Sequence, residues 1–324
     1  MTTYKEIQGS TVQNYSGDPA NPIKGQVWYD SSTESLKYSS VVASSSWSTG
    51  GNLNTGREQL GGAGATKDAA LAFGGGPPPA PTAKAQTESY NGTVWTEVND
   101  FNSAKAYVAG AGEYTSAIAS GGDQYSGVTE SWNGTSWTSV ANSPNTGNGQ
   151  AGAGADNTNA LFFGGGPHGG NAKTTYWNGS SWTALNDFNT ARAAMAGAGR
   201  TYTAALGISG GTAGSDFNVS VESFNGSSWT EIANVNTGRQ SGSGAGTQTS
   251  ALFFAGRNPS PVALAESWNG TAWTETLDLS TARNGGGNAG ASNANALLAG
   301  GSPNSVATEE WTGAGPVIRT VPQS

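Results

Sequence analysis

The sequence predicts an all-β repeat protein, and three observations support this class. A nine-residue phrase, ESWNGTSWT at 130–138, returns four times with few changes and once in degenerate form at 309–315. Its central Asn-Gly pair accepts positive φ at both turn positions, so each copy predicts a β-hairpin with an aromatic residue on each arm. A Trp recurs every 42 to 48 residues from Trp47 to Trp273. No stretch shows the 3.6-residue apolar period of a helix.

Every repeat has the same order of parts. A basic or polar residue precedes a small-residue strand such as AGAGA at 151–155, and an apolar strand ending in glycines, such as ALFFGGG at 160–166, comes next. A variable loop then leads to the aromatic hairpin. Ala and Gly suit strands that converge on an axis, where bulky side chains would clash. This order predicts four strands in each of six repeats, and such periods are typical of propellers and other repeat arrays.

These parts resemble the kelch repeat, in which an Arg precedes the first strand, Gly-Gly ends the next, and a spaced Tyr and Trp follow. The basic or polar residues are Arg57, Lys105, Asn148, Arg192, Arg239 and Arg283. The glycine pairs are Gly74-Gly75, Gly121-Gly122, Gly164-Gly165, Gly210-Gly211 and Gly300-Gly301, with Ala255-Gly256 in the fifth repeat. The resemblance implies a six-bladed β-propeller with four antiparallel strands per blade. It implies little about function, because one fold hosts many functions.

Two groups of side chains are expected to be structural in such a propeller. The repeated Arg is expected to pair with backbone carbonyls or with a carboxylate between blades. The expected aromatic anchors are Trp47, Trp95, Trp137, Trp182, Trp229, Trp273 and Trp311.

The ring is expected to close through the segment around Trp47. The sixth repeat has a first aromatic residue, Trp311, but no second Trp after it, and Trp47 precedes the first Arg. A strand around Trp47 beside the strand of Trp311 would complete the last blade and leave no exposed ring ends. The competing candidate is PVIRTV at 316–321. The predicted domains are an arm and hairpin at 1–44, the propeller at 45–315 and a tail at 316–324.

A separate pattern precedes the repeats. Two short alternating segments, QVWYD and SLKYS, flank a polar turn within 25–48. This G-x-x-W-Y-D…L-K-Y phrase, with GDPANP before it, resembles short hairpins near the N-terminus of phage structural and tail-fibre proteins. The resemblance implies attachment to other virion proteins. A hairpin that only packs on the propeller edge is the alternative interpretation.

Composition argues against several classes of function. The chain has 14 Lys and Arg against 22 Asp and Glu, a net charge of −8, and no visible basic stripe, so nucleic acid is not an expected partner. One His and no Cys are too few for a zinc site, and no phosphate-binding loop occurs, so neither an enzyme nor a cofactor is expected. The sequence shows neither a secretory signal nor a membrane-spanning apolar run. Sec-type export and membrane insertion are therefore not expected.

The candidate binding residues lie in the loop after each glycine pair, because this loop varies among repeats while the other turns vary little. Such variation in repeat folds falls on one face, often the binding face. Drift in unconstrained surface loops is the alternative explanation. The candidate ligand-binding residues are Lys84, Asp123, Tyr125, His168, Lys173, Asp216, Phe217 and Arg257.

Together these features predict a non-enzymatic virion protein, such as a phage tail fibre, spike or capsid-decorating protein. It would assemble in the host cytoplasm and form a homo-oligomer on the particle. The N-terminal arm would bind other virion proteins, and the variable loops would bind a host-surface glycan or protein. A cellular kelch-type adaptor or adhesin is the alternative, and a carbohydrate-active enzyme with a carboxylate pair is the third hypothesis.

Overall fold

The computed structural model describes residues 12–19, 25–41, 44–77, 82–123, 126–166, 170–212, 216–303, 306–314 and 316–321. These residues form 28 strands and no α-helix, so the predicted all-β class is confirmed. The chain divides into two compact units. The small unit joins Met1–Ser45 to Gly313–Ser324, and the large unit is Ser46–Thr312.

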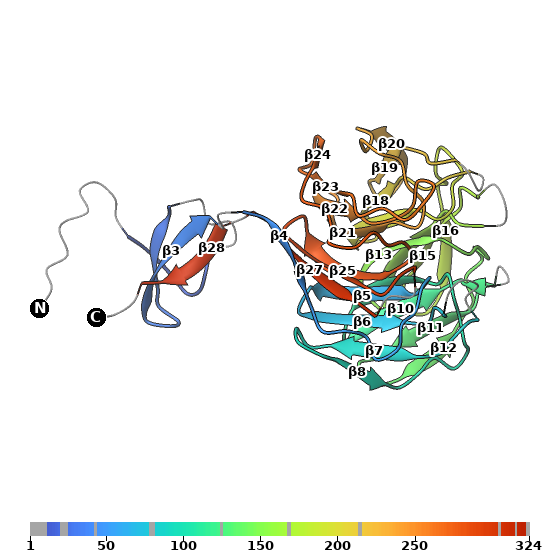
Figure 1. The fold of residues 1–324 in the computed structure, drawn as a ribbon, viewed down its shortest axis with the longest axis horizontal. Coiled ribbons are helices and arrows are strands. Elements are labelled where there is room, and N and C mark those ends of the chain that lie inside the picture. The colour runs from blue at the N-terminus through green and yellow to red at the C-terminus, as the bar shows by residue number, and fades with distance from the viewer. Residues whose placement is uncertain are drawn as a thin grey trace, which may run out of the picture. The chain divides into compact units, whose positions relative to one another are not determined.

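Among the described residues, the large unit contains six four-stranded antiparallel sheets, one for each repeat (Figure 1). The first sheet consists of β5 (Gly61–Thr66), β6 (Ala69–Phe73), β7 (Thr87–Tyr90) and β8 (Trp95–Val98). The second consists of β9 (Ala109–Glu113), β10 (Ser116–Ser120), β11 (Thr129–Trp132) and β12 (Trp137–Val140). The third consists of β13 (Ala151–Asp156), β14 (Asn159–Phe163), β15 (Thr174–Trp177) and β16 (Trp182–Leu185).

The remaining three sheets follow the same order. The fourth consists of β17 (Ala196–Thr201), β18 (Ala204–Ile208), β19 (Val221–Phe224) and β20 (Trp229–Ile232). The fifth consists of β21 (Ser243–Thr247), β22 (Ser250–Phe254), β23 (Ala265–Trp268) and β24 (Trp273–Glu275). The sixth consists of β25 (Gly287–Ser292), β26 (Asn295–Ala299), β27 (Thr308–Thr312) and, from before the first repeat, β4 (Ser46–Thr49). In this sheet Trp47 lies opposite Trp311, with 5.3 Å between the ring centroids.

The first strand of each sheet lies around a common axis. β5, β9, β13, β17, β21 and β25 contact one another in that order, and β25 also contacts β5. The strands approach so closely that a Cβ on Gly62 would lie 2.3 Å from the backbone nitrogen of Asn288. A Cβ on Gly152 would lie 2.3 Å from the carbonyl oxygen of Gly110. The small-residue pattern of these strands is therefore a packing requirement.

The aromatic hairpins form as predicted, but with a different turn. Trp132 pairs with Trp137, so the loop between them has four residues. Only the glycine of the Asn-Gly pair has positive φ, 93° at Gly134. The Asn133 side-chain oxygen accepts hydrogen bonds from the backbone N–H groups of Thr135 and Ser136, both at 2.9 Å. The expectation of positive φ at both turn positions was therefore wrong, because the Asn side chain stabilises the turn instead.

The second Trp of a hairpin joins neighbouring sheets. Trp95, Trp137 and Trp229 each donate the indole N–H to a Thr hydroxyl on the third strand of the preceding sheet. The acceptors are Thr308 at 2.9 Å, Thr87 at 3.0 Å and Thr174 at 2.9 Å. Trp47 and Trp182 are only partly buried and donate to the backbone oxygens of Leu277 and Ala141. The hydrophobic core thus lies between adjacent sheets.

A buried ion pair is present in five of the six repeats. The pairs are Arg57–Glu88 (2.7 Å), Lys105–Glu130 (2.6 Å), Arg192–Glu222 (2.9 Å), Arg239–Glu266 (3.0 Å) and Arg283–Glu309 (2.8 Å). Each arginine also donates to one or two backbone carbonyls, as predicted. The partner carboxylate belongs to the same repeat, which corrects the expectation of a carboxylate between blades.

Among its described residues, the third repeat has no such pair. Gly166 N–H donates to the Asn148 carbonyl just as Gly76 N–H donates to the Glu58 carbonyl, so Asn148 corresponds to the residue after the Arg. The Arg position is therefore Gly147, and placing Asn148 there was wrong by one residue. Thr175 stands where the other repeats have Glu. The Asn145 side chain replaces part of the missing guanidinium by donating to the Gly164 carbonyl at 3.0 Å.

The small unit is a separate four-stranded sheet in the order β1-β2-β3-β28. Its strands are β1 (Gln13–Tyr15), β2 (Val27–Asp30), β3 (Ser35–Val41) and β28 (Pro316–Thr320). β2 and β3 form the predicted hairpin. β28 pairs with β3, so the segment predicted as a tail begins with a strand of this unit.

The tryptophan and the two charges of the N-terminal phrase form the centre of this small sheet. Trp28 is fully buried. Lys37 Nζ lies 2.7 Å from Asp30 and 3.0 Å from Asp18. The hydrogen bond from Lys37 lowers the pKa of Asp30.

Candidate functional site

Six residues, one from each repeat, surround the mouth of the central axis. Each follows the Arg position by two residues and has positive φ: Gln59 (53°), Tyr107 (58°), Gly149 (60°), Ala194 (52°), Ser241 (50°) and Gly285 (66°). Backbone N–H groups join them from repeat to repeat: Tyr107 to Gln59 O (2.8 Å), Gly149 to Tyr107 O (3.3 Å), Ala194 to Gly149 O (2.9 Å), Ser241 to Ala194 O (2.8 Å) and Gly285 to Ser241 O (2.9 Å). We call these six residues the axial ring.

The backbone of the axial ring is unusual for four of its members. Gln59, Tyr107, Ala194 and Ser241 are not glycines, and such residues rarely adopt positive φ. Strained backbone of this kind persists only where the surroundings over-determine it, and it clusters at functional sites. Here the hydrogen bonds between repeats provide that constraint, so the ring marks a candidate site.

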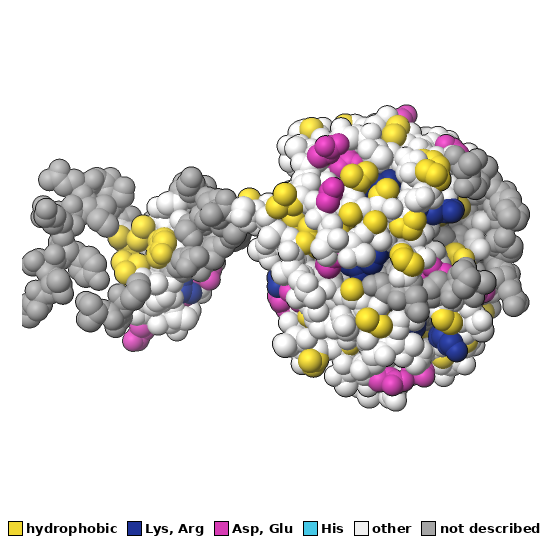
Figure 2. Space-filling model, viewed as in Figure 1, with side chains coloured by type: hydrophobic (Ala, Val, Ile, Leu, Met, Phe, Trp, Pro, Cys, Tyr) yellow, Lys and Arg dark blue, Asp and Glu magenta, His cyan; other side chains and the backbone are white. Residues whose placement is uncertain are grey.

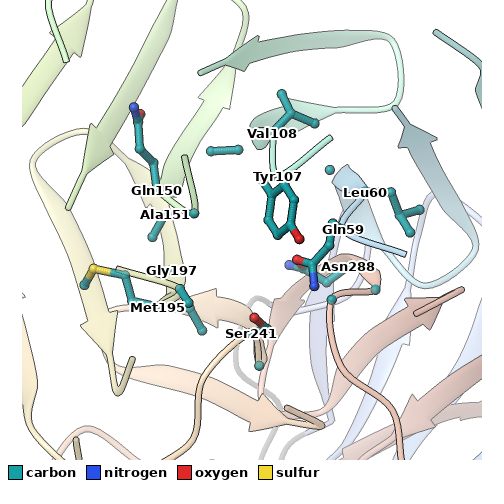
Figure 3. A pocket seen from close by; sticks show the side chains of 18 of the residues that line it. Gln59, Leu60, Tyr107, Val108, Gln150, Ala151, Met195, Gly197, Ser241 and Asn288 are labelled. Carbon is teal, nitrogen blue, oxygen red and sulfur yellow. The ribbon is translucent and has the colours of Figure 1, made fainter. Parts of the chain in front are cut away.

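The axial ring encloses a cavity of about 390 Å³ (Figure 3). This volume lies within the range of about 300–1,000 Å³ that is common for small-molecule sites. Deeper along the axis only about 50 Å³ remains between the glycine and alanine residues of the inner strands. There Arg200 of β17 forms an ion pair with Glu113 of β9 and donates to the Gly112 carbonyl at 3.4 Å. The axis therefore narrows sharply below the cavity.

The cavity has two chemically different walls. Gln59, Tyr107 and Asn288 lie together on one side in Figure 3, and the Ser241 hydroxyl also belongs to the lining. The third and fourth repeats contribute Gly149, Ala194 and Met195 on the other side. The Gln150 side chain points out of the cavity, because its amide donates to the backbone oxygens of Asn145 and Gly147 at 2.9 Å. Gln59 and Tyr107 thus make the first side the more polar one, although Leu60 and Val108 also lie in the lining, and the other side is mostly small and apolar apart from Asn148.

Tyr107 is the largest polar side chain of the axial ring. Burial raises the pKa of its hydroxyl, and the nearby carboxylates of Glu58 and Asp123 raise it further, while Arg257 acts in the opposite direction. Arg257 is itself held by a hydrogen bond from its Nη2 to Gln240 Oε1 at 2.6 Å. The Tyr107 hydroxyl is therefore protonated at neutral pH and can donate a hydrogen bond to a ligand.

The structure separates the eight residues predicted from the variable loops. Arg257 lines the cavity, and Asp123 lies close enough to influence Tyr107. Lys84 and Lys173 are exposed and do not line it. Asp216 and Phe217 do not line it either, and Asp216 accepts a hydrogen bond from the Thr212 hydroxyl at 2.7 Å within its own loop. Tyr125 and His168 lie outside the described residues.

Gln59, Tyr107 and Ser241 were not among the residues predicted from the sequence. A signal was present, since each stands two residues after the repeated Arg or Lys, at a position that varies from Gly to Tyr within otherwise regular surroundings. The variation in side-chain size at this one position of an otherwise regular repeat distinguishes these residues.

Two further features of the described residues bear on their chemistry. They contain no group of three or more His, Asp or Glu side chains that could bind a metal ion. They also form no helix long and apolar enough to cross a bilayer. On the face of the large unit seen in Figure 2, charged side chains are scattered, and no basic patch is visible.

Comparison with known proteins supports the fold. No protein-family model and no curated protein matches the chain. The chain is similar to a solved structure described as "Structure of YjhT", at 14% identity and a TM-score of 0.60, over 83% of this chain and 99% of that one. YjhT is a propeller-type protein, so the predicted β-propeller class is confirmed. At 14% identity, this similarity supports a shared fold but gives no information about function.

Proposed function

We propose that this chain is a non-enzymatic binding protein whose axial cavity takes a neutral sugar unit of a glycan. The observation that supports this is the pairing of a polar wall, with Gln59 and Tyr107, against the small apolar wall at Ala194 and Met195. A sugar ring has hydroxyl groups at its edge and C–H groups on its faces, and it can use both walls at once. Backbone held in the axial ring would keep the polar groups in place before the ligand arrives.

The architecture that we propose is a six-bladed kelch-like propeller closed by the strand around Trp47. Three features support six blades: the six sheets of the large unit, the return contact of β25 with β5, and the pairing of β4 with β27. The seventh sheet belongs to the small unit. The Arg–Glu pairs and the Gly-Gly strand ends support the kelch resemblance.

Binding is favoured over hydrolysis by the distribution of carboxylates. Among the described residues, Glu58 is the only acidic side chain that lines the cavity. Glycoside hydrolysis by the common mechanisms needs two carboxyl groups on either side of the scissile bond. The carbohydrate-active enzyme therefore remains the weaker hypothesis.

The biological setting that we propose is a virus particle. The support is the N-terminal phrase, in which Trp28, Asp30 and Lys37 form the centre of the small unit. In this proposal the small unit binds other virion proteins, and several copies of the chain are present on each particle. The axial cavity then binds a host-surface glycan or protein. A cellular adaptor or adhesin is the alternative.

The binding proposal is tested by a glycan array followed by titration calorimetry of each hit. Replacing Tyr107 by Ala should weaken glycan binding at least tenfold, because it removes the donor and much of the polar wall. Tyr114→Ala is the matched control, since Tyr114 is 44% exposed and lies outside the cavity. If both variants bind like the parent protein, the ligand does not use the axial cavity.

The virion proposal needs a separate test. Mass spectrometry of purified particles should detect the chain at stoichiometric copy number, and a chain lacking residues 1–40 should be lost from particles while the large unit stays folded. Absence of the full chain from particles would leave the cellular adaptor or adhesin as the better hypothesis.

A further inference from the structure

The second repeat contains another cavity, separate from the axial one, with a volume of about 210 Å³. Its lining includes Ser103, Lys105, Asp123 and Val128. The cation of the buried ion pair is Lys105 in this repeat, whereas the other four pairs use an arginine. The cavity thus lies where this repeat departs from the others.

In three arginine repeats, the guanidinium donates to three acceptors of its own repeat. Arg192 Nη1 donates to the carbonyl oxygens of Ser209 at 2.9 Å and Ser220 at 2.6 Å, and Nη2 donates to Glu222 at 2.9 Å. Arg57 and Arg283 make the same three hydrogen bonds with their own repeats. One planar group therefore serves one carboxylate and two carbonyls.

In the second repeat, Lys105 has a single donor nitrogen in place of the guanidinium group. Its Nζ lies 2.6 Å from Glu130 Oε1 and 4.4 Å from the centroid of the Phe101 ring. The residue that corresponds to Ser220 is Val128, since each directly precedes the third strand of its sheet, and Val128 lines the cavity. The lysine thus pairs with the carboxylate, and a cavity remains beside Val128, whose counterparts Gln86, Ser220 and Ala307 accept a guanidinium hydrogen bond through their carbonyl oxygens.

Asp123 adds a negative charge at the same place. It stands where the first, third and fourth repeats have Gly76, Gly166 and Gly211. Its Oδ2 accepts a hydrogen bond from the Ala106 N–H at 3.0 Å, and burial raises its pKa. When ionised, Lys105, Glu130 and Asp123 carry a net charge of −1, whereas each Arg–Glu pair is neutral. The cavity is therefore complementary in charge to one added cation.

We propose that this cavity of the second repeat binds a guanidinium group between the Asp123 carboxylate and the Val128 backbone. The group would come either from a small free molecule or from an arginine side chain of a partner protein. A guanidinium suits the site better than an ammonium, because its flat array of N–H donors can serve a carboxylate and a carbonyl together. This proposal does not depend on glycan binding by the axial cavity.

The test is titration calorimetry of the full chain with N-methylguanidinium at constant ionic strength, with methylammonium as the comparison ligand. Saturable binding of one N-methylguanidinium per chain is expected, with methylammonium at least tenfold weaker. Asp123→Asn should weaken the binding at least tenfold. Lys105→Arg should abolish it, because the new side chain fills the cavity from within, and should raise the melting temperature. Lys84→Ala, outside the cavity, should bind like the parent chain.

The two sources of the group are distinguished by a capped Gly-Arg-Gly peptide. Tighter binding of the peptide than of N-methylguanidinium points to an arginine of a partner, and weaker binding points to a free small molecule. The proposal is overturned if N-methylguanidinium shows no saturable binding, or if Asp123→Asn binds it as tightly as the parent chain does. Should Lys105→Arg fail to fold, Asp123→Asn decides the question.

Discussion

The third and fourth repeats have the same four-stranded backbone but hold it with different chemistry. The fourth repeat uses Arg192 and Glu222, both essentially buried, with Phe188 stacked on Trp229 at a centroid distance of 3.9 Å. The third repeat has Gly147 and Thr175 at the positions of the ion pair. It has Ser143 at the position of Phe188, since Ser143 and Phe188 make equivalent backbone hydrogen bonds to Gly127 and Ala172.

This difference teaches that the repeat geometry does not require a buried charge. Arg and Glu are lost together in the third repeat, which avoids leaving one charge unpaired in the interior. The Asn145 side chain supplies a neutral donor in their place, to the carbonyl oxygens of Gly164 at 3.0 Å and Lys173 at 3.5 Å. The ion pair is therefore one of two solutions to satisfying the same buried carbonyls, and its value depends on both partners being present.

The largest expected effect comes from breaking the pair in the fourth repeat. Arg192→Met should lower the free energy of unfolding by about 4 kcal/mol, because it leaves Glu222 buried without its partner. Asn145→Ala in the third repeat should cost about 2 kcal/mol, since it removes a neutral donor only. Urea denaturation of both variants measures the difference. Equal costs would mean that the charge of the fourth repeat has no special role.

Removing both charges should reverse much of that loss. The double variant Arg192→Met, Glu222→Leu is expected within about 2 kcal/mol of the parent protein, because no unpaired charge remains. A double-mutant cycle with Glu222→Leu alone gives the coupling energy of the pair. Additive losses in the cycle would contradict the view that the two charges depend on each other.

The second tryptophan of the hairpin should also contribute more to stability in the fourth repeat than in the third. Trp229 is 5% exposed and packs on Phe163 and Phe188, whereas Trp182 is only partly buried. Trp229→Ala should therefore cost about 4 kcal/mol and Trp182→Ala about 2 kcal/mol, following the cost of emptying aromatic core sites. Thermal and urea unfolding of both variants provide the measurement, and a reversed order would refute the role assigned to the Phe188 stack.

The smallest expected effect is an increase in stability. Thr174 in the third repeat accepts the indole N–H of Trp229, but the corresponding residue in the fourth repeat is Val221. The indole N–H of Trp273 accordingly has no hydrogen-bond partner among the described residues. Val221→Thr should raise the free energy of unfolding by about 1 kcal/mol, because it supplies the missing acceptor. The same substitution in a Trp273→Phe background should give no gain.

Part of this molecule could be predicted because local physics decides it. The hairpins follow from Asn-Gly and the flanking aromatics, and the inner strands follow from Ala and Gly, which tolerate close approach. Both signals lie within a few residues and are repeated along the chain, so the all-β propeller class and the hairpin of β2 and β3 could be predicted correctly. The turn type was wrong because the Asn133 side chain competes for the backbone N–H groups.

The site could not be predicted in the same way. Nothing in the residues next to Gln59 or Tyr107 requires positive φ, and the hydrogen bonds that hold this backbone come from the neighbouring repeat, more than 40 residues away along the chain. The register of the third repeat was equally hidden, because Gly147 carries no side chain and its role passes to Asn145.

By itself, then, the sequence determined the strands, the repeat order and the spacing of the anchors, because each depends on contacts within one repeat. Only the tertiary structure decided which side chains meet at the axis, which repeat lacks its ion pair, and where a cavity remains beside Lys105. These depend on how six nearly equal units pack against one another, and small differences between units have their effect only in that packing.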